Sequence, residues 1–168
     1  MLIRDLFDGA PWVAEVADLQ WQKLLREPLD VYQDPDRTEA LLLQAHQLMP
    51  ERLEVLVALY KMYAYSNQFS KAQQRIHQVL QLSARDAGFA PDWWHLDAGS
   101  GPWDPAEGAA RWYLYSLKAM GFVLLRQQEL GQALAVLYKL QQLDPRDQVG
   151  GSVVLELAQR LEEGAEAD

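Results

Sequence analysis

The stretch "LLRQQELGQALAVLYKLQQLDPRD", residues 124–147, has a counterpart earlier in the chain, "YAYSNQFSKAQQRIHQVLQLSARD", residues 63–86. An offset of 61 residues aligns seven pairs of apolar side chains: Leu56 with Leu117, Leu59 with Met120, Tyr63 with Leu124, Phe69 with Leu130, Ala72 with Ala133, Ile76 with Leu137 and Leu82 with Leu143. It also aligns three identical polar residues: Gln81 with Gln142, Arg85 with Arg146 and Asp86 with Asp147. A shared helical period can align apolar residues by chance, but it does not also align the turn that follows. We infer an internal repeat.

Each copy is predicted to form two helices joined by a tight turn. The apolar positions fall at helical spacing, and a short polar break interrupts them at "SNQ", residues 66–68, and at "QQE", residues 127–129. This pattern is typical of a helix-turn-helix unit.

The second copy resembles the tetratricopeptide repeat (TPR), a helix-turn-helix of about 34 residues. The matching residues are Leu117, Met120, Gly121, Leu124, Leu130, Ala133, Leu140 and Pro145. Small residues at Gly121 and Ala133 allow close helix packing, and Pro145 ends the second helix because it lacks a backbone donor. In the first copy Tyr60 replaces the small residue and Ala84 replaces the proline, which predicts a wider helix crossing and a less sharply ended second helix.

The resemblance implies an all-α fold, a right-handed α-α superhelix forming a short TPR-like solenoid of about seven helices. We expect a single domain over residues 1–168. Its predicted parts are an N-terminal helix or cap (1–35), a half repeat (36–50), a repeat (53–86), a Trp-rich insertion (87–113), a second repeat (114–147) and a C-terminal capping helix (148–163). The capping helix is expected to present a polar outer side, which solenoids require. This polar side is predicted to consist of Glu156, Gln159, Arg160, Glu162 and Glu163.

The later part of the insertion contains signals for the start of a helix. Asp104 is a candidate N-cap, Pro105 suits the first helical position, and Glu107 places an acid in the first turn. We therefore expect the first helix of the second repeat to begin near residue 105, about two turns earlier than in a standard repeat.

Composition excludes several classes of function. The net charge of -9 disfavours nucleic acid, because affinity for phosphate backbones comes from Lys and Arg. No cysteine is present, and no apolar run approaches the length of a membrane span. Charged residues also interrupt the N-terminus, where a secretory signal needs an apolar run. The expectation is a cytoplasmic protein that does not bind membranes.

No constellation of catalytic residues is recognisable, so we expect a protein that is not an enzyme and has no cofactor. The best metal candidate is the segment containing Asp92, His95 and Asp97, but its spacing matches no defined metal loop. Acidic residues in a solvated loop are the simpler interpretation, and a metal-handling protein or enzyme that uses this segment stays an alternative.

Tryptophans are concentrated in the insertion, at Trp93, Trp94 and Trp103. The simpler interpretation is that they fold the insertion onto the repeats as a second small core. Alternatively, some of them form an anchor for a partner, because Trp is enriched at interface hot spots. We expect Trp93 to be more exposed than Trp94.

The resemblance to TPR proteins also implies a concave groove, lined by first helices, that binds a peptide or a partner helix. The positions carried over are Glu54, Val57, Lys61 and Tyr65 in the first copy, and Arg111, Tyr115, Lys118, Phe122 and Arg126 in the second. Helical spacing turns this stripe away from the packing positions, so we expect it to be free of core contacts. Its basic and aromatic character favours an acidic, apolar ligand.

The sequence therefore predicts a non-catalytic protein-protein interaction module: an adaptor, assembly factor or chaperone. A chaperone of the type III secretion kind, also small, acidic and built on TPRs, is the alternative within this class. The sequence does not distinguish a monomer from a homo-oligomer, or a groove that binds a partner from one covered by the insertion.

Overall fold

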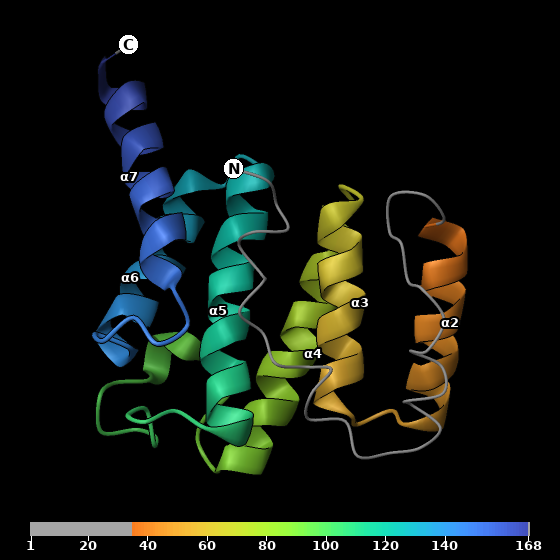
Figure 1. The fold of residues 1–168 in the computed structure, drawn as a ribbon. Coiled ribbons are helices and arrows are strands. Elements are labelled where there is room, and N and C mark those ends of the chain that lie inside the picture. Colours follow the sequence, from red (N-terminus) through yellow and green to blue (C-terminus); the bar gives the residue numbers. More distant parts are fainter. Residues whose placement is uncertain (1–34, 168) are drawn as a thin grey trace. The chain divides into compact units, whose positions relative to one another are not determined.

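The computed structural model describes residues 35–167, and within this range the chain contains six α-helices, one 3-10 helix and no strand. The elements are α2 (Pro35–Leu48), α3 (Leu53–Tyr65), α4 (Phe69–Ala87), η2 (Trp93–His95), α5 (Gly108–Arg126), α6 (Leu130–Leu143) and α7 (Gly151–Ala167). Figure 1 labels the six α-helices. The all-α prediction is confirmed for this part of the chain. The helix predicted within residues 1–35 lies outside the described residues.

The chain divides into two compact units, and the boundary falls inside α4, between Gln78 and Val79. The first unit contains α2, α3 and the beginning of α4, and the second contains the rest of α4 with η2, α5, α6 and α7. Each unit has fully buried apolar side chains: Leu56, Leu59 and Ile76 in the first, and Leu114, Leu117, Leu137 and Leu140 in the second. Each unit therefore has its own apolar core.

The two predicted turns have the same backbone structure at the predicted offset. Asn67 and Gln128 both adopt positive φ, 61° and 64°. Gln68 N donates to Tyr63 O at 2.8 Å, and Glu129 N donates to Leu124 O at 2.9 Å. Bonds of this span after a left-handed residue define the Schellman motif, which satisfies the last carbonyls of a helix. The helix-turn-helix prediction is confirmed for both copies.

The two second helices end differently, as the sequence predicts. Helix α4 runs for 19 residues, to Ala87, whereas α6 stops after 14, at Leu143. Ala84 continues α4, whereas its counterpart Pro145 lies just beyond the end of α6. Proline explains the difference because it cannot donate the backbone hydrogen bond that the helix would need.

Gly121 allows α5 and α6 to approach closely. A Cβ atom at this position would lie 2.5 Å from Leu137 Cδ2 and 2.6 Å from Leu137 Cγ, both far inside van der Waals contact. Atoms this close must move apart, so the position has no room for a side chain. The role predicted for Gly121 is therefore confirmed.

Helix α5 begins at Gly108, with Glu107 as N-cap, so the predicted start near residue 105 is wrong. Tertiary contacts hold the preceding residues instead: Asp104 pairs with Arg146 at 2.9 Å, and Ala106 N donates to Gln148 Oε1 at 2.9 Å. The expected extra length is still present, since α5 has 19 residues and α3 has 13.

In the first unit, a polar contact links all three helices. Tyr63 of α3 donates its hydroxyl to Glu39 Oε2 of α2 at 2.6 Å, and Lys71 of α4 lies 3.8 Å from the same carboxylate. The Lys71 ammonium also lies 5.5 Å from the centre of the Tyr63 ring. The pKa of Tyr63 is raised to about 12, mainly by burial and secondly by the hydrogen bond to Glu39.

Tyr63→Phe is expected to make stability less sensitive to alkaline pH. The folded chain keeps the Tyr63 proton up to about pH 12, whereas the unfolded chain loses it near 10.0. Stability therefore falls as pH rises through this window, because the folded state binds more protons than the unfolded state. Urea titrations across the window should give a shallower slope for Tyr63→Phe than for the wild type. Equal slopes would contradict the assignment.

Candidate functional site

Residues 88–107 of the Trp-rich insertion connect α4 to α5, and three hydrogen bonds attach this connection to helices or to itself. Tyr113 of α5 donates to Pro91 O at 2.7 Å, and Lys139 of α6 donates to Leu96 O at 2.6 Å. Trp103 Nε1 donates to Asp97 O at 3.0 Å. Because these bonds satisfy loop carbonyls from both ends of η2, the short helix is held in place against α6.

Trp103 belongs to the core of the second unit, and its prediction as an exposed anchor is wrong. Its side chain is 4% exposed and packs 4.7 Å from the Phe89 ring and 6.1 Å from the Tyr113 ring. Gly101 makes room for it, because a Cβ atom there would lie 2.8 Å from the Trp103 ring. This residue fits the simpler interpretation, in which tryptophans fold the insertion onto the helices.

Trp94 is the exposed tryptophan of the insertion. Its side chain is 57% exposed, whereas Trp93 is half-buried, so the expectation that Trp93 would be more exposed is wrong. The two rings meet edge to face, with centroids 5.4 Å apart. Trp93 therefore supports the ring of Trp94, and η2 presents that ring to solvent.

The predicted metal candidates Asp92, His95 and Asp97 do not form a cluster. Asp97 Oδ1 accepts hydrogen bonds from Gly99 N at 2.9 Å and Ser100 Oγ at 3.0 Å, as expected for a side chain that stabilises a turn. Among the residues that the structure describes, no group of three His, Asp or Glu side chains is placed to hold a metal ion.

The first-helix stripe predicted to line a groove is largely buried. Val57 and Lys61 of α3 are buried, while Glu54 and Tyr65 are partly exposed. In α5, Tyr115, Lys118 and Phe122 are buried, Arg111 is half-buried and Arg126 is exposed. The expectation that this stripe is free of core contacts is therefore wrong for its central residues.

In α5, the stripe is not free because it contacts the loop between α6 and α7. Lys118 Nζ donates to Val149 O at 3.1 Å, and Arg111 Nη2 donates to Gln148 O at 3.3 Å. Burial lowers the pKa of Lys118, and attraction to Asp147 opposes the change. Lys118 also lies 5.7 Å from the centre of the Tyr115 ring. The two basic residues thus hold the chain's own backbone.

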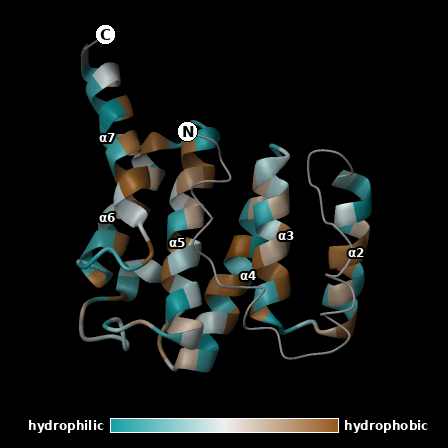
Figure 2. Ribbon diagram, in the orientation of Figure 1, coloured by the Kyte–Doolittle hydropathy of each residue, from teal (hydrophilic) through white to brown (hydrophobic). Residues whose placement is uncertain are grey.

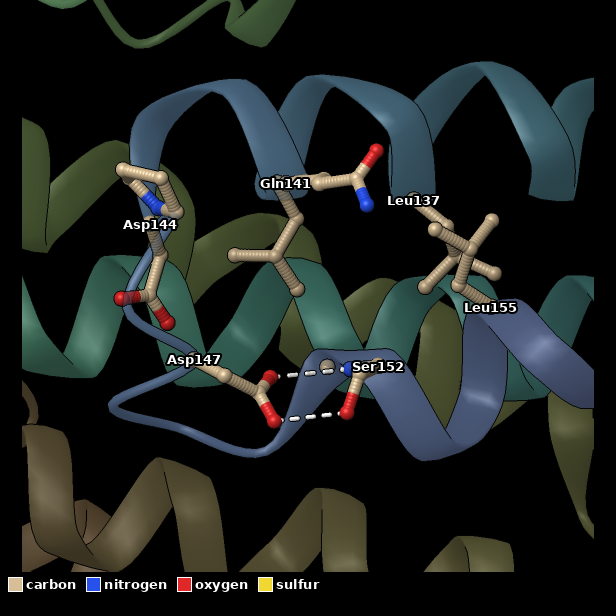
Figure 3. Close-up of a pocket in the computed structure, with 9 residues that line it drawn as sticks. Leu137, Gln141, Asp144, Asp147, Ser152 and Leu155 are labelled. Carbon is tan, nitrogen blue, oxygen red and sulfur yellow. Dashed lines mark hydrogen bonds between the residues drawn. The ribbon is translucent and has the colours of Figure 1, made fainter.

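A small pocket lies between α6 and α7, lined by residues of both helices and of the loop that joins them (Figure 3). Asp147 lies at its edge and accepts hydrogen bonds from Ser152 N at 3.0 Å and Ser152 Oγ at 2.6 Å. The cavity volume of about 60 Å³ has room for a few water molecules, whereas ligand sites typically exceed 300 Å³. The pocket is therefore too small for a metabolite.

Helix α7 carries an exposed apolar ridge that the sequence analysis missed. Val153, Leu157 and Leu161 are 40%, 41% and 50% exposed. Apolar bands alternate with hydrophilic ones along this helix in Figure 2. The predicted polar outer side is thus only partly polar: Glu156, Arg160 and Glu163 are exposed beside the ridge. The spacing of four residues was the available signal, because it places the three apolar side chains on one face.

In the part of the chain that the structure describes, no helix combines the length and apolar character needed to cross a membrane.

Over residues 35–167, these observations define an all-helical chain with a repeated helix-turn-helix, a tryptophan presented by a fixed loop and an apolar ridge on its last helix. Comparison with known proteins finds no matching family model and no matching solved structure. The chain is similar to the "Uncharacterized 19.8 kDa protein in nifW 5'region" of Azotobacter chroococcum mcd 1, with 31% identity over 121 residues, which cover 71% of this chain and 68% of the relative. The chain belongs to the family of that protein.

Proposed function

We propose that the protein is a non-catalytic protein-protein interaction module built as a short, right-handed, TPR-like solenoid. Support for the repeat comes from the Schellman turns at Asn67 and Gln128, which share their hydrogen bonds at an offset of 61 residues. Repeat folds of this kind present extended surfaces, which suit them to binding other proteins.

The observation that carries the binding proposal is the exposure of Trp94 on a fixed loop. A large aromatic side chain held by its neighbours loses little conformational entropy on binding, and Trp dominates many interface hot spots. Lys139 and Trp93 hold the loop and the ring, so the anchor is ready before the partner arrives. Recognition therefore centres on the insertion, near the beginning of α5. Arg126, the exposed member of the predicted groove, lies at the other end of α5 and would contact only a partner that extends along this helix.

Trp94→Ala is expected to weaken partner binding by about thirtyfold or more, the effect typical of a hot-spot residue. The name of the Azotobacter relative places it in the nifW 5′ region, so the nifW product is the first defined protein to test. Binding is measured by calorimetry, and proteins captured from the native cell are identified by mass spectrometry.

The matched control is Leu48→Ala, which removes another exposed apolar side chain, 53% exposed, from α2. It should retain every partner that the wild type binds. Unfolding curves should show both variants close to wild type, since neither side chain is buried. A partner set that is the same for Trp94→Ala and the wild type would move the binding surface away from the insertion.

A further inference from the structure

The ridge on α7 has the geometry of a helix-packing surface. Val153, Leu157 and Leu161 follow one another at intervals of four residues. Such rows form the ridges that interdigitate when two α-helices cross at about −50°. The three side chains are about half exposed, and a contiguous apolar surface of this kind marks an interaction site more often than scattered apolar residues do.

A comparison with α5 shows that the ridge of α7 occupies a helix position that is covered elsewhere in the repeat. An offset of 34 residues, the length of the second repeat, places Ala119 and Val123 of α5 opposite Val153 and Leu157 of α7. Both α5 side chains are 0% exposed, whereas both α7 side chains are about 40% exposed. The same helix position is therefore covered in α5 and open in α7.

Charge selects the kind of helix that fits this ridge. Helix α7 carries four glutamates and one arginine, a formal charge of −4 + 1 = −3. Glu156 and Glu163 are exposed beside the ridge. A second copy of this chain would bring the same acidic surface against the first, and like charges at an interface disfavour association. A helix with basic flanks would pair with these glutamates.

We propose that the α7 ridge binds an amphipathic helix of a different protein, with an apolar stripe seated on Val153, Leu157 and Leu161 and with Lys or Arg beside that stripe. This inference deepens the proposed function and rests on it, because it names the chemistry of a partner. The ridge is a different surface from Trp94, so an experiment can contradict the ridge proposal without contradicting the Trp94 proposal, and the reverse.

The test uses a fluorescent amphipathic Leu/Lys peptide of about 18 residues, long enough for five helical turns. Its binding to the full chain is measured by fluorescence anisotropy, with a Leu/Glu peptide of the same pattern for comparison. The basic peptide should bind the wild type, and Leu157→Glu should weaken binding by about tenfold or more, equivalent to about 1.4 kcal/mol. The acidic peptide should not bind.

Leu48→Glu is the matched control, because it adds the same negative charge at another exposed leucine. General attraction between a basic peptide and an acidic protein would make Leu157→Glu bind as well as Leu48→Glu, and that result would overturn the proposal. Leu161→Glu provides a second ridge variant if Leu157→Glu unfolds. Trp94→Ala should bind the basic peptide as the wild type does, whatever its effect on the partners assigned to the insertion.

Sedimentation velocity tests whether a second copy of this chain occupies the ridge instead. The wild type is expected to sediment without dimer formation through this ridge. A concentration-dependent dimer that disappears in Leu157→Glu would instead assign the ridge to a second copy of this chain and would overturn the proposal.

Discussion

Gly121→Val is expected to destabilise the second unit by about 3 kcal/mol or more, at the upper end of the cost of overpacking a core. Even the first carbon of a side chain at this position would lie 2.5 Å from Leu137 Cδ2 and 2.6 Å from Leu137 Cγ. Leu137 is 1% exposed, so its side chain could yield only by displacing buried neighbours or by entering the small pocket that it lines. Valine adds two methyl groups beyond that carbon, so we expect α5 and α6 to move apart and lose contacts.

Gly131→Ala is the matched control in the same repeat. No atom lies within 4 Å of a Cβ built at Gly131, so alanine fits without displacement. Alanine also reduces the conformational freedom of the unfolded chain, which should stabilise helix α6 by about 0.5–1 kcal/mol. Urea unfolding followed by circular dichroism compares the variants. A Gly121→Val variant as stable as the wild type would mean that the close packing of α5 and α6 is not needed.

Gly121 also shows why the repeat could be predicted from the sequence. The close packing at Gly121 is predictable because the residue is small and lies on the apolar face of its helix. The helix that packs against it, α6, follows in the chain after a short turn. The same holds for the turn residues Asn67 and Gln128, whose positions follow from where the apolar period breaks. Helix-turn-helix units depend on local contacts, which periodicity and turn chemistry describe well.

The start of α5 shows where local signals fail. Asp104 and Pro105 have the residue types of a helix N-terminus, yet the helix begins at Gly108. Asp104 instead pairs with Arg146, a residue 42 positions later in the chain. This ion pair and the hydrogen bond from Ala106 N to Gln148 Oε1 are contacts with distant residues, which the local capping signals do not reveal.

The predicted groove was inaccurate for a similar reason. Helical spacing predicts a stripe that is separate from the packing positions, but it could not predict that the loop after α6 contacts Lys118 on that stripe. Lys118 donates a hydrogen bond to the carbonyl of Val149, which lies 31 positions later in the chain. The two tryptophans of η2 were also beyond sequence analysis, because a loop has no period from which the exposed member could be read.

Asp144→Ala is expected to destabilise the second unit by about 3 kcal/mol, because it removes the acceptor of two backbone donors, Gln148 N and Val149 N, at about 1–3 kcal/mol each. Asp144 is 4% exposed, and its carboxylate accepts three hydrogen bonds. Oδ1 accepts from Gln148 N and Gln148 Nε2, each at 3.0 Å, and Oδ2 accepts from Val149 N at 3.1 Å. Its loss would release the loop between α6 and α7.

The effect should spread beyond the loop, because Gln148 connects Asp144 to the Trp-rich insertion. Gln148 Nε2 also donates to Trp103 O at 2.7 Å, and its Oε1 accepts from Ala106 N at 2.9 Å. Asp147→Ala is the matched control: it removes an exposed aspartate that caps Ser152, and it should cost only about 1 kcal/mol. Urea midpoints measure both variants, and equal losses would show that burial does not distinguish the two aspartates. Trp94 is presented by the same insertion, so we expect Asp144→Ala to weaken partner binding as well, whereas Asp147→Ala should not.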